Sequence, residues 1–278
     1  MKRFITLLLT VTFVLSLTGC SNPFSKSTDT AEEEEKTDIT AVHTKGSMDG
    51  VTLKIGVSPD FAPFTYQDEQ GEMKGFDIDY LDIISEYLGF DYVLVVEQMA
   101  DIETDIEEGK IDCAISGISI TDSRQADFLF TDSYFSNSLT IIKNKDVEAE
   151  SRKDLVHMKL GAEKGTAADE YLEKYLKKYN NTIRTFENST KMFRALERGR
   201  LDAAIYDATG VEYYMDHHPD TNIEILDANL NEDESSYGIM CGKDFKYLDE
   251  FNVAMKQLDL SGSYQELYNK WFRAKSEE

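Results

Sequence analysis

Polar and charged side chains follow the strands that the sequence predicts, at the points where those strands end. In open α/β sheets, ligands bind beyond the carboxyl ends of the strands. Arg124, with the amides of a helix that begins near Thr166, suits a carboxylate, because guanidinium and helix N-terminal N–H groups both bind anions. Asp207 and the carbonyl of Gly117 suit an ammonium group, and the ring of Phe61 can cover an apolar stem. Taken together, these residues predict a site for a zwitterion.

Two of these residues also have ordinary structural explanations when each is considered alone. Arg124 is compatible with a surface ion pair, and Asp207 is compatible with a helix cap. Their common location at strand ends, where Ser119 and Thr121 add hydroxyl groups, favours the ligand site.

The elements that must position this site follow an α/β pattern. Segments 51–57, 92–96 and 111–115 are short and rich in aliphatic residues, which is typical of strands. Asp77 is a candidate cap for a helix with apolar residues on one face, and Gly89 is a candidate end for it. Because strands alternate with helices, the pattern favours largely parallel sheets with helices on their faces.

A weak internal repeat divides the chain into two related halves. Residues 107–115 match residues 197–205 in a shared pattern of helix end, glycine, basic residue, aliphatic residue, aspartate, any residue, alanine and isoleucine. A related strand precedes each copy, at 54–57 and 159–162. Because a repeated order of elements indicates a repeated architecture, we expect two similar α/β lobes. A final helix over 263–273 carries an aromatic and aliphatic stripe that predicts packing against one lobe.

Composition and charge exclude several classes of function. The 278 residues carry a formal net charge of −24, which argues against binding nucleic acid or an anionic membrane surface through charge. The sequence contains no phosphate-binding loop and no zinc-protease motif, and its four histidines do not cluster. We therefore expect no metal, no cofactor and no catalytic residue, and we expect a monomer.

The first twenty residues resemble the signal peptide of a bacterial lipoprotein. A basic start precedes an apolar run over residues 4–17, and a glycine stands before Cys20 as in a lipobox. The resemblance implies that residues 1–19 are removed and that Cys20 is lipidated, for example with palmitate. The protein would then be anchored in the cell membrane on its extracytoplasmic face. An ordinary secretory signal and an uncleaved anchor are the alternatives. Residues 20–48 are rich in Ser, Thr, Asp, Glu and Lys, which predicts a flexible acidic tether.

Two further cysteines, Cys113 and Cys241, lie in apolar segments that are typical of strands. Buried free thiols are the simplest interpretation. An exported protein can also form disulfides, and pairing becomes feasible if the two strands are neighbours.

Short segments spread over residues 51–273 resemble the polar amino-acid-binding proteins of ABC importers, family 3 of the bacterial solute-binding proteins. The segments that carry this resemblance are 55–64, 75–79, 110–121, 130–134, 165–166, 199–207, 237–238 and 262–272. The resemblance implies a two-lobed fold of the periplasmic-binding-protein type II, a Venus flytrap in which each lobe is a mixed sheet flanked by helices.

The same resemblance implies boundaries for the two lobes. Lobe 1 would contain residues 50–136 and 238–278, and lobe 2 would contain residues 142–233. The hinges would lie near 138–141 and 234–237, and closure about them would enclose the ligand.

The resemblance also implies roles for individual residues. Arg124 would bind the ligand α-carboxylate with help from Ser119 and Thr166. Asp207 and the Gly117 carbonyl would hold the α-ammonium. The ligand side chain would contact three residues, namely Phe61, Met99 and Glu163.

One departure from the family bears on the ligand. Many relatives carry an aspartate where this chain has Ser58, and that aspartate often contacts a polar or cationic side chain. Glu163 offers an acidic group instead, which would suit a cationic amino acid such as arginine or lysine. Glu163 is also compatible with a pair to Lys164 or with a solvent-facing position. Cystine, glutamine and other polar amino acids therefore remain open.

The expected partners are a free amino acid, an ABC permease and membrane lipid reached through Cys20. Two other functions share this fold. The chain could be a sensory domain that signals through a separate membrane receptor. It could also be a dehydratase, with Glu163 as general acid or base near Arg124.

Overall fold

The computed structural model describes residues 44–230 and 236–273. The predicted signal peptide, Cys20 and the tether up to residue 43 lie outside the described residues. In the described part of the chain, no helix is both long enough and apolar enough to cross a membrane. Residues 44–48, which the sequence assigned to the tether, pack on the fold. Met48 is fully buried, and its amide donates to the carbonyl of Leu88 at 2.8 Å.

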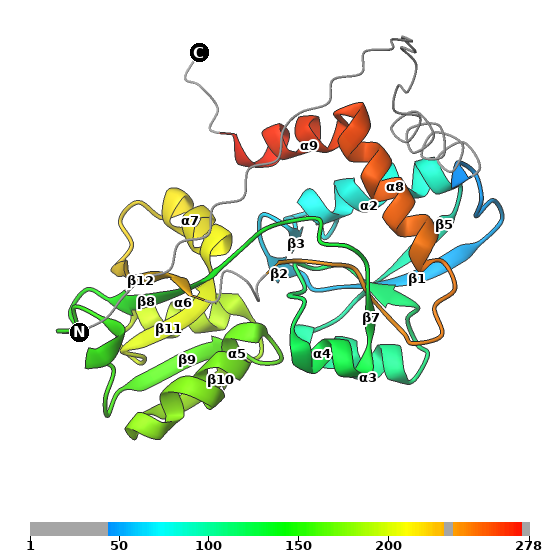
Figure 1. The fold of residues 1–278 in the computed structure, drawn as a ribbon. Helices are drawn as coiled ribbons and strands as arrows, with labels where there is room; N and C mark the ends of the chain where they lie inside the picture. Colours follow the sequence, from blue (N-terminus) through cyan, green and yellow to red (C-terminus); the bar gives the residue numbers. More distant parts are fainter. Residues whose placement is uncertain (1–43, 231–235, 274–278) are drawn as a thin grey trace, which may run out of the picture. The chain divides into compact units, whose positions relative to one another are not determined.

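The first sheet contains five strands in the order β5-β1-β6-β13-β7. Figure 1 labels β1, β5 and β7 of this sheet. The strands are β1 (Thr52–Val57), β5 (Asp91–Val96), β6 (Cys113–Ala114), β7 (Leu129–Phe130) and β13 (Met240–Cys241). Strand β1 is parallel to β5 and β6, whereas β13 is antiparallel to β6 and β7. The sheet is therefore mixed, because β13 returns from a distant part of the chain.

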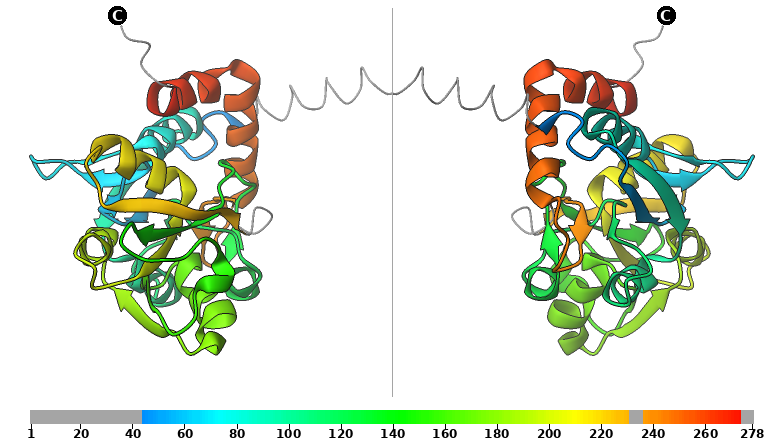
Figure 2. Two further views of the ribbon diagram at one scale, coloured as in Figure 1. Left: turned by 90° about the vertical axis from the view of Figure 1, so that its left-hand side faces the viewer. Right: turned by 90° about the vertical axis from the view of Figure 1, so that its right-hand side faces the viewer.

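Five helices and a small hairpin sheet accompany this first sheet. The helices are α2 (Phe76–Leu88), α3 (Met99–Glu107), α4 (Asp122–Asp127), α8 (Leu248–Ser261) and α9 (Ser263–Phe272), and the small strands are β2 (Asp60–Phe61), β3 (Thr65–Gln67) and β4 (Met73–Lys74). Helices α8 and α9 pack on α2 (Figure 2). The predicted aromatic stripe of the last helix takes part in this packing, since Trp271 Nε1 donates to Asp79 and the Tyr264 hydroxyl donates to the Tyr134 carbonyl.

The second sheet also has five strands, in the order β10-β9-β11-β8-β12. The strands are β8 (Leu139–Asn144), β9 (Lys159–Glu163), β10 (Thr182–Phe186), β11 (Ala203–Asp207) and β12 (Ile223–Leu230), and the α-helices are α5 (Ala167–Tyr171), α6 (Ser189–Glu197) and α7 (Ala208–His217). Strand β9 is parallel to β10 and β11, whereas β8 is antiparallel to β11 and β12. We refer to the first sheet with its helices as lobe 1 and to the second as lobe 2.

The internal repeat corresponds to equivalent pairs of strands in the two sheets. In lobe 1 the register pairs Ile55 with Cys113, and in lobe 2 it pairs Leu160 with Ala203. The repeated aspartate has the same role in both copies: Asp112 Oδ2 accepts from the Lys54 amide at 2.7 Å, and Asp202 Oδ2 accepts from the Lys159 amide at 2.7 Å. The repeat thus holds two neighbouring strands in register once in each lobe.

The connection from lobe 1 to lobe 2 is shorter than the sequence suggested. Strand β8 begins at Leu139, which lies opposite Asp207 in the second sheet, so most of the expected hinge at 138–141 belongs to lobe 2. In the return connection, Tyr237 bridges to Ser119 and Phe135, and so belongs to lobe 1. Residues 231–235, which include Glu234 of the second expected hinge, lie outside the described residues.

Candidate functional site

A small cavity lies where loops of the two lobes meet. Its lining includes all eight residues that the sequence predicted for the ligand site: Phe61, Met99, Gly117, Ser119, Arg124, Glu163, Thr166 and Asp207. Four more residues complete the lining, namely Ser116, Ile118, Ala167 and Tyr206. Each of the four is adjacent in the chain to a predicted residue, so the strand-end pattern located their segments.

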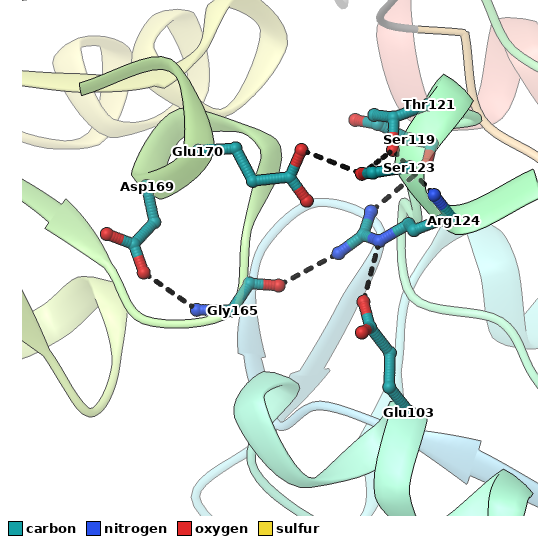
Figure 3. A network of polar contacts seen from close by, with 8 residues as sticks. All are labelled: Glu103, Ser119, Thr121, Ser123, Arg124, Gly165, Asp169 and Glu170. Atoms are coloured by element: carbon teal, nitrogen blue, oxygen red, sulfur yellow. Dashed lines mark hydrogen bonds and ion pairs between the residues drawn. The ribbon is translucent and has the colours of Figure 1, made fainter. Parts of the chain in front are cut away.

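Arg124 lies in α4 and is only 4% exposed (Figure 3). Its Nε donates to Glu103 Oε1 at 2.9 Å, its Nη1 to the Ser119 carbonyl at 3.0 Å, and its Nη2 to the Gly165 carbonyl at 2.8 Å. A guanidinium carries five N–H groups, and these bonds use three. One N–H on each terminal nitrogen makes no bond to the described residues. These two N–H groups can donate to a carboxylate, and we refer to them as the fork of Arg124.

The alternative explanation of Arg124, a surface ion pair, is therefore right about the pairing and wrong about the surface position. The ion pair with Glu103 exists, but the guanidinium is buried at the cavity. Glu103, on α3, was not identified from the sequence, because no local pattern links it to Arg124.

Asp207 is the last residue of β11 and stands immediately before α7. Its side chain makes no capping bond to that helix, so the helix-cap alternative is wrong. Oδ1 instead accepts from Asn137 Nδ2 and from the Tyr237 hydroxyl, each at 2.7 Å. Burial raises the pKa of Asp207 to about 6, although Tyr237, Arg124 and Asn137 oppose the shift. An ammonium group at this carboxylate would favour its ionised form.

Glu163 ends β9 and is 4% exposed, so it does not point to solvent. It forms no ion pair with Lys164 or with any other cation in the described ranges 44–230 and 236–273. Burial first, and then the charges of Asp60 and Asp207, raise the pKa of Glu163 to about 8. A buried carboxyl without a cation is costly to ionise, and a cation from a ligand would remove that cost.

Gly117 and Phe61 are in direct contact in the cavity wall. Gly117 has a φ of +56°, and a Cβ built on it would lie 2.0 Å from the Phe61 ring, so a side chain at this position would displace the ring. On the other side, the Phe61 ring meets the edge of Tyr206 with centroids 5.7 Å apart. The ring of Phe61 is thus fixed between glycine backbone and a second aromatic ring.

Asp77 holds the backbone of Gly117 in place through a hydrogen bond. The sequence suggested Asp77 as a helix cap, but the residue before α2 is Gly75, and Asp77 is fully buried. Its Oδ2 accepts from the Gly117 amide at 2.7 Å and from the Tyr134 hydroxyl at 3.0 Å. The cap prediction was wrong because bonds to residues far away in the chain take the place of a local one.

The Thr166 hydroxyl and the Ser119 carbonyl both form hydrogen bonds within the protein. The Thr166 hydroxyl donates to the Glu163 carbonyl and accepts from the Asp169 amide, so it caps α5. The carbonyl of Ser119 accepts from Arg124. Met99, the first residue of α3, is 8% exposed and adds an apolar surface.

Hydrogen bonds between side chains or carbonyls of the two lobes join the lobes to each other. The Arg124 bond to Gly165 and the Ser123 bond to Glu170, at 3.0 Å, join α4 to the start of α5 (Figure 3). On another side, the Ser189 hydroxyl donates to the Asp60 carbonyl at 2.6 Å. Of these contacts, the Arg124 bond joins the two lobes at the cavity itself.

The site's buried carboxyl groups predict an unusual dependence of stability on pH. The pKa is raised to about 7 in Asp77, about 8 in Glu163 and about 6 in Asp207. Such groups keep protons in the folded state that the unfolded chain releases, so their stabilising contribution is complete below pH ~4 and is lost as pH rises to ~8. We expect the Tm of the ligand-free protein to fall as pH rises from 5 to 8.5.

Glu163→Gln provides the control for this thermal unfolding series, with the exposed Glu187→Gln as the matched variant. Removal of Glu163 should flatten the fall in Tm, whereas removal of Glu187 should only shift the curve. Equal slopes in all three proteins would contradict a buried, unpaired Glu163.

Comparisons with known proteins agree with this architecture. Residues 53–274 match the model of the family described as bacterial extracellular solute-binding proteins, family 3. The arginine-binding periplasmic protein of Mannheimia haemolytica is 26% identical over 80% of this chain and 91% of its own length. An ancestral arginine-binding protein bound to arginine is 30% identical with a TM-score of 0.75, covering 83% of this chain and all of that one. The arginine-, lysine-, histidine-binding protein of Geobacillus stearothermophilus is 28% identical with a TM-score of 0.74, covering 80% of this chain and 96% of its own.

Proposed function

Because the chain belongs to family 3 of the bacterial extracellular solute-binding proteins, we propose that it captures a free amino acid outside the cytoplasm and delivers it to an ABC importer. One observation carries the proposal: the open fork of Arg124 and the buried carboxylate of Asp207 line the same cavity. The fork suits the α-carboxylate, and Asp207 with the Gly117 carbonyl suits the α-ammonium.

A panel of thermal unfolding curves tests the proposal. Ligand-stripped protein is heated with each of the twenty common amino acids, ornithine and cystine at millimolar concentration. A ligand that binds only the folded state raises Tm, by an amount that grows with its concentration over its Kd. A concentration-dependent rise with at least one amino acid supports the proposal, and an unchanged Tm across the panel rejects it.

Within this function we propose that the ligand is a cationic amino acid. The support is Glu163, a buried carboxyl without a described cation partner, together with the arginine-binding relatives. A guanidinium or ammonium at the far end of the ligand would pair with Glu163 while its backbone binds Arg124 and Asp207. Glutamine, which lacks a side-chain cation, would leave Glu163 unpaired.

Glu163→Gln should lower the affinity for arginine or lysine by about 10- to 1,000-fold, because it removes a buried charge pair. The affinity for glutamine should change much less, since no side-chain charge is lost. Calorimetric titration of both proteins with arginine, lysine and glutamine measures the difference. Glu187→Gln, an exposed change of the same type, should leave all three affinities as they are. Equal losses for charged and neutral ligands would contradict the cationic assignment.

We also propose that ligand binding is coupled to closure of lobe 2 on lobe 1. The hinges would lie near 136–138, where the chain passes from the first sheet to the second, and at the return crossing that the sequence predicts near 234–237. Closure would remove water from the charged groups of the ligand and complete their bonds. Small-angle X-ray scattering should show a smaller radius of gyration with saturating ligand, and an unchanged radius would exclude closure.

The location of the protein in the cell is a further part of the proposal. We propose that Cys20 carries a lipid that anchors the chain to the outer face of the cytoplasmic membrane, within reach of its permease. Labelled palmitate should be incorporated into the native chain and not into Cys20→Ala, which should be released from the membrane.

A sensory role would need a separate receptor, and a dehydratase role would need turnover. Unchanged amino acid recovered after long incubation supports binding without catalysis.

A further inference from the structure

Cys113 and Cys241 lie directly opposite each other on two neighbouring strands of lobe 1. Strand β6 carries Cys113 and strand β13 carries Cys241, and the two strands are antiparallel with these residues in register. Directly opposed residues of an antiparallel pair have Cα atoms about 4.5–5.5 Å apart and side chains on the same face. A disulfide needs Cα atoms about 4.4–6.8 Å apart. The register therefore satisfies the main geometric requirement for a bond between the two residues.

The two thiols contact each other in the core. Both are fully buried, and the structure holds both as free thiols. A hydrogen bond with Cys241, and then burial, raise the pKa of the Cys113 thiol well above its usual value. Cys241 Sγ also lies 3.8 Å from the Ile239 carbonyl. Neither cysteine belongs to a group of side chains that could hold a metal, among the residues that the structure describes.

We propose that Cys113 and Cys241 form a disulfide in the exported protein, and that this bond joins the two separate chain segments of lobe 1. The family is extracellular, and disulfides persist in oxidising surroundings. The chain between the two cysteines includes all five strands of the second sheet. The bond would link the two segments of lobe 1 that flank lobe 2 in the sequence. It would also restrict the unfolded chain, because it closes a long loop.

The reaction must occur during folding, because the folded thiols are buried and weakly acidic. The thiolate of one cysteine attacks a disulfide of an oxidant, such as oxidised glutathione or an oxidoreductase, and releases one thiol from it. The thiolate of the other cysteine then attacks the mixed disulfide and releases the second thiol. Two protein thiols become one disulfide, and the oxidant disulfide takes up the two electrons and two protons.

Peptide mapping of the full chain, isolated from the envelope of an exporting bacterium, tests the proposal. Free thiols are blocked with iodoacetamide under denaturing conditions, and the protein is digested without reduction. We expect a linked pair of peptides that contain Cys113 and Cys241, which separates after reduction. The same chain refolded with oxidised glutathione should give the linked pair as well. Alkylation of both cysteines in both samples would overturn the proposal.

A stability measurement provides the second readout. The linked chain should unfold at a Tm at least about 5 °C higher than the same chain in reductant. Cys113→Ala and Cys241→Ala should each show the same Tm with and without reductant, and either variant serves if the other does not fold. A reductant effect of equal size in a single-cysteine variant would assign the shift to another cause and overturn the proposal. Neither readout depends on the identity of the ligand.

Discussion

Arg124→Ala should lower amino-acid affinity by about 30- to 3,000-fold, the loss expected when one partner of a buried charge pair is removed. The variant loses the two N–H groups that the described residues leave open on a side chain lining the cavity, and the ligand carboxylate would then be enclosed without a cation. Arg124→Lys should retain part of the affinity, because it keeps the charge and loses the fork. Calorimetric titration with the ligand that binds the native chain most tightly measures both losses.

The control for Arg124 is Arg184→Ala, an exposed arginine on β10 in lobe 2. This change should leave affinity and Tm close to those of the native chain. Circular dichroism must also show that Arg124→Ala folds, since the side chain bonds to carbonyls of both lobes. A folded Arg124→Ala with native affinity would mean that the ligand carboxylate binds elsewhere.

Asp207→Asn should reduce affinity about 100-fold or more, because it replaces the acceptor for the ligand ammonium with a neutral amide. The amide is similar in size, and its oxygen can still accept from Asn137 and Tyr237. The loss should therefore come from charge and not from packing. Asp216→Asn, an exposed change on α7, is the matched control.

The pH dependence of binding gives Asp207 a second readout. Its pKa is about 6 in the ligand-free protein, so affinity for an ammonium group should fall as pH decreases below 6 and the carboxylate takes up a proton. Asp207→Asn should lose this part of the dependence. Native affinity in the variant, or an unchanged dependence on pH, would contradict an ammonium contact at Asp207.

The architecture was largely predictable because its signals are local. Short apolar strands, glycines at helix ends and the repeated aspartates Asp112 and Asp202 each reflect contacts with nearby residues or a neighbouring strand. Six of the eight predicted site residues were chosen for a related reason, since ligand groups gather where strands end, whereas Met99 and Glu163 came from the family resemblance. The family resemblance then assigned their roles. The register of the repeat shows that the repeated sequence pattern corresponds to the same strand pairing in both lobes.

What the sequence did not predict depends on long-range contacts. Asn137 and Tyr237 hold Asp207 from 70 and 30 residues away, and Asp77 reaches Gly117 over 40 residues. No local pattern marks such partners, so the sequence suggested a helix cap for Asp77 and left a helix cap open as the alternative for Asp207. The antiparallel pairing of strands β7, β8, β12 and β13 was not predicted for the same reason. Their partners are set by the crossings between lobes, which local periodicity does not reveal.

The central claim is that the cavity binds the α-carboxylate and the α-ammonium of one amino acid. Calorimetric titration of ligand-stripped protein with the tightest-binding amino acid, its methyl ester and its N-acetyl derivative tests it most directly. The account predicts one site per chain for the free amino acid and at least about 100-fold weaker binding of both derivatives, since each has lost one charge. Comparable affinity for all three compounds, or no heat from any amino acid, would contradict it.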